Sequence, residues 1–206
     1  MEILFNYIDK GGLIFFFLFF LSVLTITIIL FKFFELYLLK NLDFSKFSEI
    51  LEQAPSGITI NEIKENFIEL APKSKEEFIT KILDVLESNK SKENIEKEID
   101  RLTQKEFEKI QLFLPSLEII SQVSPLIGLL GTVIGMIDSF NELELGGSLV
   151  DPSILAGGIW TALLTTAMGL VVAIPALVSH YFFEKRVLYF FSSIENLFQK
   201  LSFLKK

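Results

Sequence analysis

The sequence predicts an all-α integral membrane protein with three transmembrane helices, of which the second and third extend into a cytoplasmic helical bundle. Two observations lead to this fold class. Half of the 206 residues are apolar and 22 are phenylalanine, which is more than soluble domains of this length usually carry. The apolar residues also gather into three long stretches, and the charged stretches between them have helical periodicity.

The first transmembrane helix is predicted within residues 1–40. Gly11 to Phe31 are 21 consecutive uncharged residues, and at about 1.5 Å per residue such a helix spans roughly 30 Å, the thickness of one hydrocarbon core. A cleaved signal peptide would have a shorter apolar core and a basic leading end, whereas the leading end here contains Glu2 and Asp9. We therefore expect an uncleaved helix whose N-terminus lies outside.

The distribution of charge orients the other segments. Residues 113–140 and 153–183 are predicted as the second and third transmembrane helices, and the connection between them, residues 141–152, contains no Lys or Arg. Basic residues follow the first and third spans, and such residues favour the cytoplasm. We therefore expect a periplasmic loop between the second and third spans, a cytoplasmic helical region at residues 41–112 and a cytoplasmic C-terminal helix at residues 184–206.

Net charge and composition limit the classes of function. A net charge of −7 argues against nucleic acid as a partner, and the absence of cysteine excludes disulfides and thiolate metal sites. The sequence has no nucleophile–base pair, metal-ligand cluster or phosphate-binding loop, and its one histidine, His180, lies at a membrane edge. We therefore expect no enzymatic activity, metal or cofactor, and a lipid bilayer as the surroundings.

A narrow apolar stripe with helical spacing runs from the cytoplasmic region into the second span. Its members are Ile95, Ile99, Leu102, Glu106, Ile110, Phe113 and Leu117. Glu106 is the one charged member. Because the stripe is otherwise continuous, we expect one long helix that leaves the membrane, with Pro115 and Pro125 placed to bend it.

The C-terminal segment has a similar apolar face. Its members are Val187, Phe190, Phe191, Ile194, Leu197, Phe198 and Leu201. Two interpretations of these cytoplasmic faces stay open. One is a helical bundle that contacts a partner protein, and the other, which is simpler, is packing within and between copies of the chain.

Small residues follow one side of each of the second and third spans, within an arc of about 60° on a helix with about 100° per residue. Small residues allow helix backbones to approach closely. The residues predicted to pack these helices together are Gly128, Gly131, Gly135, Gly158, Ala162, Gly169 and Ala173.

Threonine hydroxyls accompany the small residues at comparable depths in the two spans. The candidate ion-path residues are Thr132, Thr166, Thr165 and Thr161. Hydroxyls can solvate an ion but do not titrate at physiological pH. Because neither span has an Asp, Glu, Lys or Arg in its middle, a titrating group would have to come from another polypeptide. The residues alone leave a second interpretation open, in which each Thr bonds a backbone carbonyl and the stripes serve packing only.

Two segments carry a resemblance to a known family. PLIGLLGTVIGMIDSF at 125–140, followed by GGIWTALLTTAMGLVVAIPALV at 157–178, resembles the MotA/TolQ/ExbB proton channel family, closest to its ExbB/TolQ branch. The resemblance implies a multi-pass protein of the bacterial inner membrane, with a periplasmic N-terminus and a cytoplasmic C-terminus. It also implies a homopentamer whose pore holds a dimer of a single-span ExbD/TolR-like partner, and a TonB/TolA-like energy transducer as a further partner.

The function implied by the resemblance is that of a ring subunit in an ion-motive-force-driven motor. Such a subunit conducts protons with its partner and couples the flow to work at the periplasm or outer membrane. The pore threonines of the family correspond to Thr132 and Thr166, whereas Thr161 stands where many relatives have Glu and Thr165 where a small Ala is common. The extra hydroxyls keep a sodium-driven member as an alternative, and a passive scaffold that only oligomerises is the alternative from another class.

Overall fold

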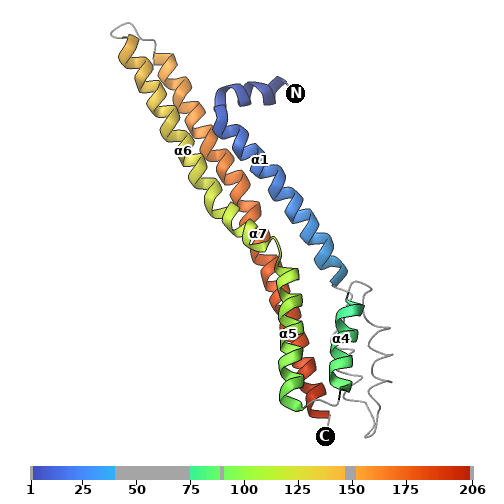
Figure 1. Cartoon of the computed structure of the whole chain (residues 1–206). Helices are drawn as coiled ribbons and strands as arrows, with labels where there is room; N and C mark the ends of the chain where they lie inside the picture. The colour runs from blue at the N-terminus through green and yellow to red at the C-terminus, as the bar shows by residue number, and fades with distance from the viewer. Residues whose placement is uncertain (1, 40–74, 89–90, 147–151, 205–206) are drawn as a thin grey trace. The chain divides into compact units, whose positions relative to one another are not determined.

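The computed structural model describes residues 2–39, 75–88, 91–146 and 152–204 (Figure 1). These residues form α1 (Glu2–Leu39), α4 (Glu76–Glu87), α5 (Lys92–Gln111), α6 (Leu114–Gly146) and α7 (Pro152–Leu204). No strand occurs among them, and three helical segments are long and apolar enough to cross a membrane: Gly12–Tyr37, Lys92–Leu145 and Leu155–Asn196. The all-α membrane fold is therefore confirmed. Residues 41–74 of the predicted cytoplasmic region 41–112 and residues 147–151 of the predicted loop 141–152 lie outside the described residues.

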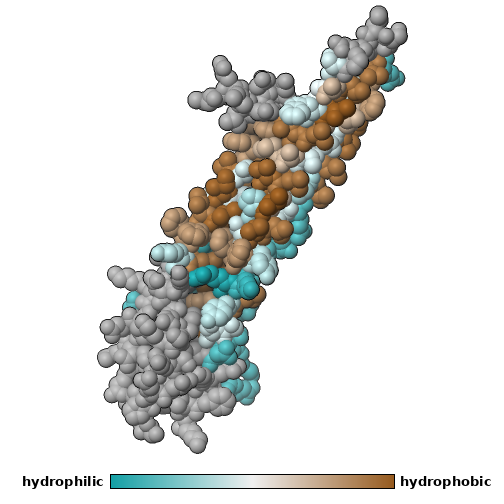
Figure 2. Space-filling view, turned by 180° about the vertical axis from the view of Figure 1, so that it is seen from behind, coloured by the Kyte–Doolittle hydropathy of each residue, from teal (hydrophilic) through white to brown (hydrophobic). Residues whose placement is uncertain are grey.

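The chain forms two compact units. The first contains Met1–Phe31 and Phe113–Tyr181, and the second contains Lys32–Leu112 and Phe182–Lys206. In the first unit, α1 buries a narrow face that includes Phe15, Leu18 and Ile28. Hydrophobic side chains, brown in Figure 2, cover much of the surface shown. Large exposed apolar surface is what a bilayer or further membrane helices would cover.

A glycine marks the N-terminal end of the first apolar segment. Gly12 interrupts the helical backbone of α1 with φ 61° and ψ −159°. A residue with a side chain rarely adopts this left-handed φ, whereas glycine does so at little cost. The two helical pieces of α1 therefore meet at Gly12, where the predicted membrane span begins.

The prediction of one continuous helix from the cytoplasmic region into the second span is wrong. α5 ends at Gln111 and α6 begins at Leu114, with Phe113 between them at φ 71°. Pro115 supplies the reason, since it has no N–H to donate to the carbonyl of Gln111 and its ring is tolerated only in the first turn of a helix. Pro125, in contrast, lies inside α6 without ending it.

The second unit packs the amphipathic faces that the sequence predicts. α4 and α5 contact each other, and both bury an apolar face. On α7 the buried residues are Val187, Phe190, Phe191 and Ile194, while the side chains of Leu197, Phe198 and Leu201 lie outside the described residues. The rings of Phe107 and Phe191 meet edge to face at 4.6 Å between centroids. The described part of the C-terminal apolar face is thus covered within this unit.

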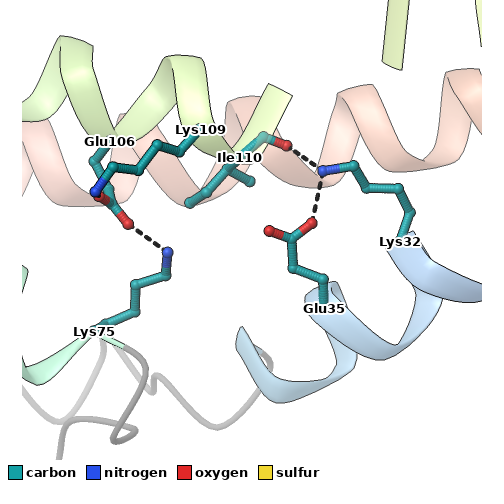
Figure 3. A network of polar contacts seen from close by, with 6 residues as sticks. All are labelled: Lys32, Glu35, Lys75, Glu106, Lys109 and Ile110. Carbon is teal, nitrogen blue, oxygen red and sulfur yellow. Dashed lines mark hydrogen bonds and ion pairs between the residues drawn. The ribbon is translucent and has the colours of Figure 1, made fainter. Parts of the chain in front are cut away.

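Glu106, the charged member of the apolar stripe, faces inward. It is 7% exposed, and its carboxylate accepts from Lys75 Nζ at 2.5 Å and from Lys109 Nζ at 3.2 Å (Figure 3). A buried carboxylate is stable only when it is paired and hydrogen-bonded. The break in the stripe is therefore an ion pair that links α5 to the residue preceding α4.

This pairing predicts a dependence of stability on pH. Burial alone would raise the pKa of the Glu106 carboxyl, but the ammonium groups of Lys75 and Lys109 outweigh it and hold the pKa below its usual 4.5. The folded pKa is thus lower than the unfolded one, so the stabilisation is present above about pH 4.5 and is lost as the pH falls through the folded pKa. Thermal unfolding of the detergent-solubilised protein should begin at lower temperature only in this acidic range. Glu106→Gln should flatten the profile, whereas Glu77→Gln, at an exposed pair, should leave it unchanged.

Candidate functional site on the α6 and α7 pair

At Gly128 and Gly169 the backbones of α6 and α7 lie against each other. A Cβ atom added to Gly128 would lie 2.8 Å from the carbonyl oxygen of Thr165 and 3.0 Å from Thr166 Cα. A Cβ on Gly169 would lie 2.6 Å from the Ser124 carbonyl oxygen and 3.2 Å from Gly128 Cα. Because these neighbours are backbone atoms, they cannot rotate away, and only a hydrogen atom fits at either position.

Other small residues of the two helices meet side chains. A Cβ on Gly131 would lie 2.5 Å from Thr165 Oγ1, and a Cβ on Gly158 would overlap the hydroxyl of Ser139. The predicted packing residues that lie where α6 and α7 meet are Gly128, Gly131, Gly135, Gly158, Ala162 and Gly169. Ala173 is also buried.

Gly158→Ala tests this packing at one point. The new methyl group would displace the Ser139 hydroxyl, which donates to the Gly135 carbonyl at 2.8 Å. We expect a loss of about 1–2 kcal/mol in unfolding free energy, the usual range for an added methyl in a packed interior. Ser139→Gly in the same chain should recover most of the loss. Gly157→Ala should have little effect, since nothing lies within 4 Å of a Cβ there; equal losses for Gly157→Ala and Gly158→Ala would contradict this packing.

Thr165 differs from the other predicted ion-path residues because it is enclosed between the helices. Its side chain is 2% exposed, and its Oγ1 donates to the Ala162 carbonyl at 2.7 Å and lies 3.2 Å from the Gly128 carbonyl oxygen. In this arrangement Thr165 has almost no surface that an ion could reach. Its contacts with Gly128 and Gly131 are those of a packing residue.

Thr132 and Thr166 lie on the same side of the helix pair. Thr166 Oγ1 donates to the Gly128 carbonyl at 3.3 Å, and Thr132 follows Gly128 by four residues, which is about 40° around α6. Thr132 is half-buried and donates to the Leu129 carbonyl at 2.7 Å. When the hydroxyl hydrogen is donated in this way, the oxygen lone pairs remain available to a cation.

Thr161 lies on the opposite flank of α7. It precedes Thr166 by five residues, which places the two about 140° apart around the helix. Its hydroxyl donates to the Gly157 carbonyl at 3.0 Å. The four predicted path residues thus divide into Thr132 with Thr166 on one side, Thr161 on the other, and Thr165 between the helices.

The carbonyl oxygen of Gly128 was not anticipated from the sequence. Thr165 and Thr166 both direct their hydroxyls toward this one backbone oxygen. A backbone carbonyl acceptor cannot be recognised from residue type. Two adjacent threonines at the depth of a glycine on the neighbouring helix would nevertheless suggest such an acceptor. Within the described ranges, no group of three or more His, Cys, Asp or Glu side chains could hold a metal ion.

Comparison with known proteins gives a family and several relatives. The model of the family described as the MotA/TolQ/ExbB proton channel family matches residues 70–196. An ExbB-like biopolymer transport protein of Synechocystis is 38% identical over 99 residues, which cover 48% of this chain and 47% of the relative. The biopolymer transport protein exbB1 of Vibrio cholerae is 45% identical over 60 residues, 29% of this chain and 26% of the relative.

The relatives also include a protein named for the Tol-Pal system. The Tol-Pal system protein TolQ of Pseudomonas aeruginosa is 39% identical over 82 residues, covering 40% of this chain and 35% of the relative. The chain thus spans less than half the length of these relatives. The family match covers the α6 and α7 motifs and extends to α4 and α5.

Proposed function

This chain belongs to the MotA/TolQ/ExbB proton channel family, and on this premise we propose that it is a ring subunit of an ion-driven motor in the bacterial inner membrane. Homologues named for biopolymer transport and for the Tol-Pal system support this proposal. In the proposed complex it conducts protons and couples their flow to work at the periplasm or outer membrane. Sodium is the alternative ion, because the path offers hydroxyl oxygens.

The observation that carries the proposal is that Thr132 and Thr166 lie on the same side of the α6 and α7 pair, close to the Gly128 carbonyl. Thr166 donates to that carbonyl, and Thr132 lies one helical turn farther along α6. The two hydroxyl oxygens therefore offer lone pairs on one side of a tightly packed helix pair. Thr165 and the glycines hold the pair together, and Thr161, on the opposite flank, would affect neighbouring packing more than this path.

The proposed complex requires a partner that carries charge. The middle parts of the second and third membrane spans, residues 113–140 and 153–183, contain no Asp, Glu, Lys or Arg, and hydroxyls cannot bind and release a proton near neutral pH. We propose a homopentamer around a dimer of an ExbD/TolR-like protein, whose single span supplies a carboxylate, together with a TonB/TolA-like transducer. The proposed topology has a periplasmic N-terminus and a cytoplasmic C-terminus, in keeping with the basic residues after the first and third spans.

The test is ion-driven activity of the chain reconstituted with its single-span partner. Thr132→Val and Thr166→Val together keep the side-chain shape but remove both oxygens, and we expect at least a roughly tenfold loss of ion flux with assembly unchanged. Thr161→Val is the matched control and should retain most of the flux. If the double variant conducts as well as the parent protein, the path assignment is wrong. Comparing a sodium gradient with a pH gradient identifies the ion.

A passive scaffold is the second candidate, and one observation favours it. The hydroxyls of Thr132, Thr161, Thr165 and Thr166 all donate to carbonyls of the same chain. Threonines in membrane helices commonly bond in this way without conducting ions. A scaffold would assemble normally and show no ion flux with any partner, so the same reconstitution separates the two functions.

A further inference from the structure

Lys32 on α1 is buried completely, although its sequence position suggests an ordinary basic residue after a membrane span. Its exposure is 0%. Its Nζ lies 2.6 Å from Glu35 Oε2 and 2.8 Å from the Ile110 carbonyl oxygen (Figure 3). Burying an ammonium group is costly unless it is paired and hydrogen-bonded, so these two acceptors explain how the charge is tolerated.

The acceptor on α5 lies at the end of that helix. α5 ends at Gln111, and the last four carbonyls of a helix have no intrahelical N–H partner. The Ile110 carbonyl is one of these, and Lys32 donates to it from another helix. A positive charge at a helix C-terminus also interacts favourably with the helix dipole. Lys32 therefore caps α5 by both hydrogen bonding and charge.

α5 is held at a second point, one turn earlier. Glu106, one turn before Ile110, is paired with Lys75, the residue that precedes α4 (Figure 3). Exposed ion pairs such as Lys81–Glu77 join residues of one helix only, and such pairs contribute little to the stability of a fold. The two buried lysines instead connect separate segments of the chain to the last two turns of α5.

We propose that Lys32 is a positioning residue, which fixes the C-terminal end of α5 to the last turns of α1 and so holds the point at which α5 ends. Phe113, three residues after Ile110, has a strained φ of 71°. A non-glycine residue holds such a conformation only when its surroundings impose it. α1 is then more than a lipid anchor, because its last turns hold the end of α5.

Hydrogen exchange on the assembled protein tests the cap directly. Lys32 is fully buried, whereas 29% of the Glu35 side chain is exposed. The decisive variant is Lys32→Met/Glu35→Met, because it removes both charges and leaves neither the ammonium group nor the carboxylate unpaired. We expect amides of residues 107–112 to exchange about tenfold faster, the effect of losing one charge-assisted hydrogen bond. Glu35→Gln, whose amide oxygen still accepts from Lys32, should stay near the parent rate.

The control for general effects of charge is Lys81→Met/Glu77→Met at the exposed pair on α4, which should leave these amides unchanged. Unchanged exchange in Lys32→Met/Glu35→Met, or equal acceleration in Glu35→Gln, would overturn the cap. Failure of the double variant to assemble would also overturn it, since Lys32 would then be needed for folding rather than positioning.

Discussion

Replacing Gly169 with valine should prevent α6 and α7 from packing together. The first added atom would already lie 2.6 Å from the Ser124 carbonyl oxygen and 3.2 Å from Gly128 Cα. Neither neighbour is a side chain that can rotate, so the helices must separate along their length. Added groups in a packed interior usually cost about 1–3 kcal/mol, and a backbone clash of this kind should reach or exceed about 3 kcal/mol. Thermal unfolding in detergent and the yield of assembled complex both measure the effect.

Gly157→Val is the matched control for this prediction. Gly157 is on the same helix, but nothing lies within 4 Å of a Cβ built there. The two substitutions have the same intrinsic helix propensity change, so their difference isolates the contact between the helices. Equal unfolding temperatures for the two variants would show that α6 and α7 do not approach each other at Gly169.

Replacing Glu106 with alanine should destabilise the second unit strongly. The substitution leaves Lys75, which is 8% exposed, without the carboxylate that accepts from its Nζ. Removing one partner of a buried ion pair typically costs about 3–5 kcal/mol, because the remaining charge stays buried and uncompensated. Chemical unfolding of the solubilised protein, followed by the helical signal, measures the change.

Two further variants identify the cause. Glu77→Ala removes a carboxylate from the exposed pair with Lys81 and should change stability little. Lys75→Met/Glu106→Leu replaces the buried pair with apolar groups and should recover most of the loss seen in Glu106→Ala. If the double variant is as unstable as Glu106→Ala, the lost charge pairing is not the reason for the instability.

The spans and their small residues could be read from the sequence because each depends on local composition. An uncharged stretch as long as Gly11 to Phe31 is long enough to cross a bilayer wherever it lies in the fold. The glycines of α6 and α7 were similarly accessible, since helical periodicity places them on one face of each helix. The different positions of the threonines could not be predicted in this way. Thr132 and Thr166 lie on one side of the helix pair, Thr161 on the other and Thr165 between the helices. Periodicity alone does not say which edge of a stripe the neighbouring helix covers.

The amino-acid sequence by itself determined the helical membrane class, the family and the faces along which helices pack, because hydropathy and periodicity act over neighbouring residues. Only the tertiary structure decided what the buried charges do. Glu106 was a flaw in an apolar stripe and Lys32 a flanking basic residue until Lys75, Glu35 and the Ile110 carbonyl were found beside them. Lys75 is 31 residues from Glu106 and Ile110 is 78 residues from Lys32 in the sequence, and folding alone brings these partners of the buried charges together.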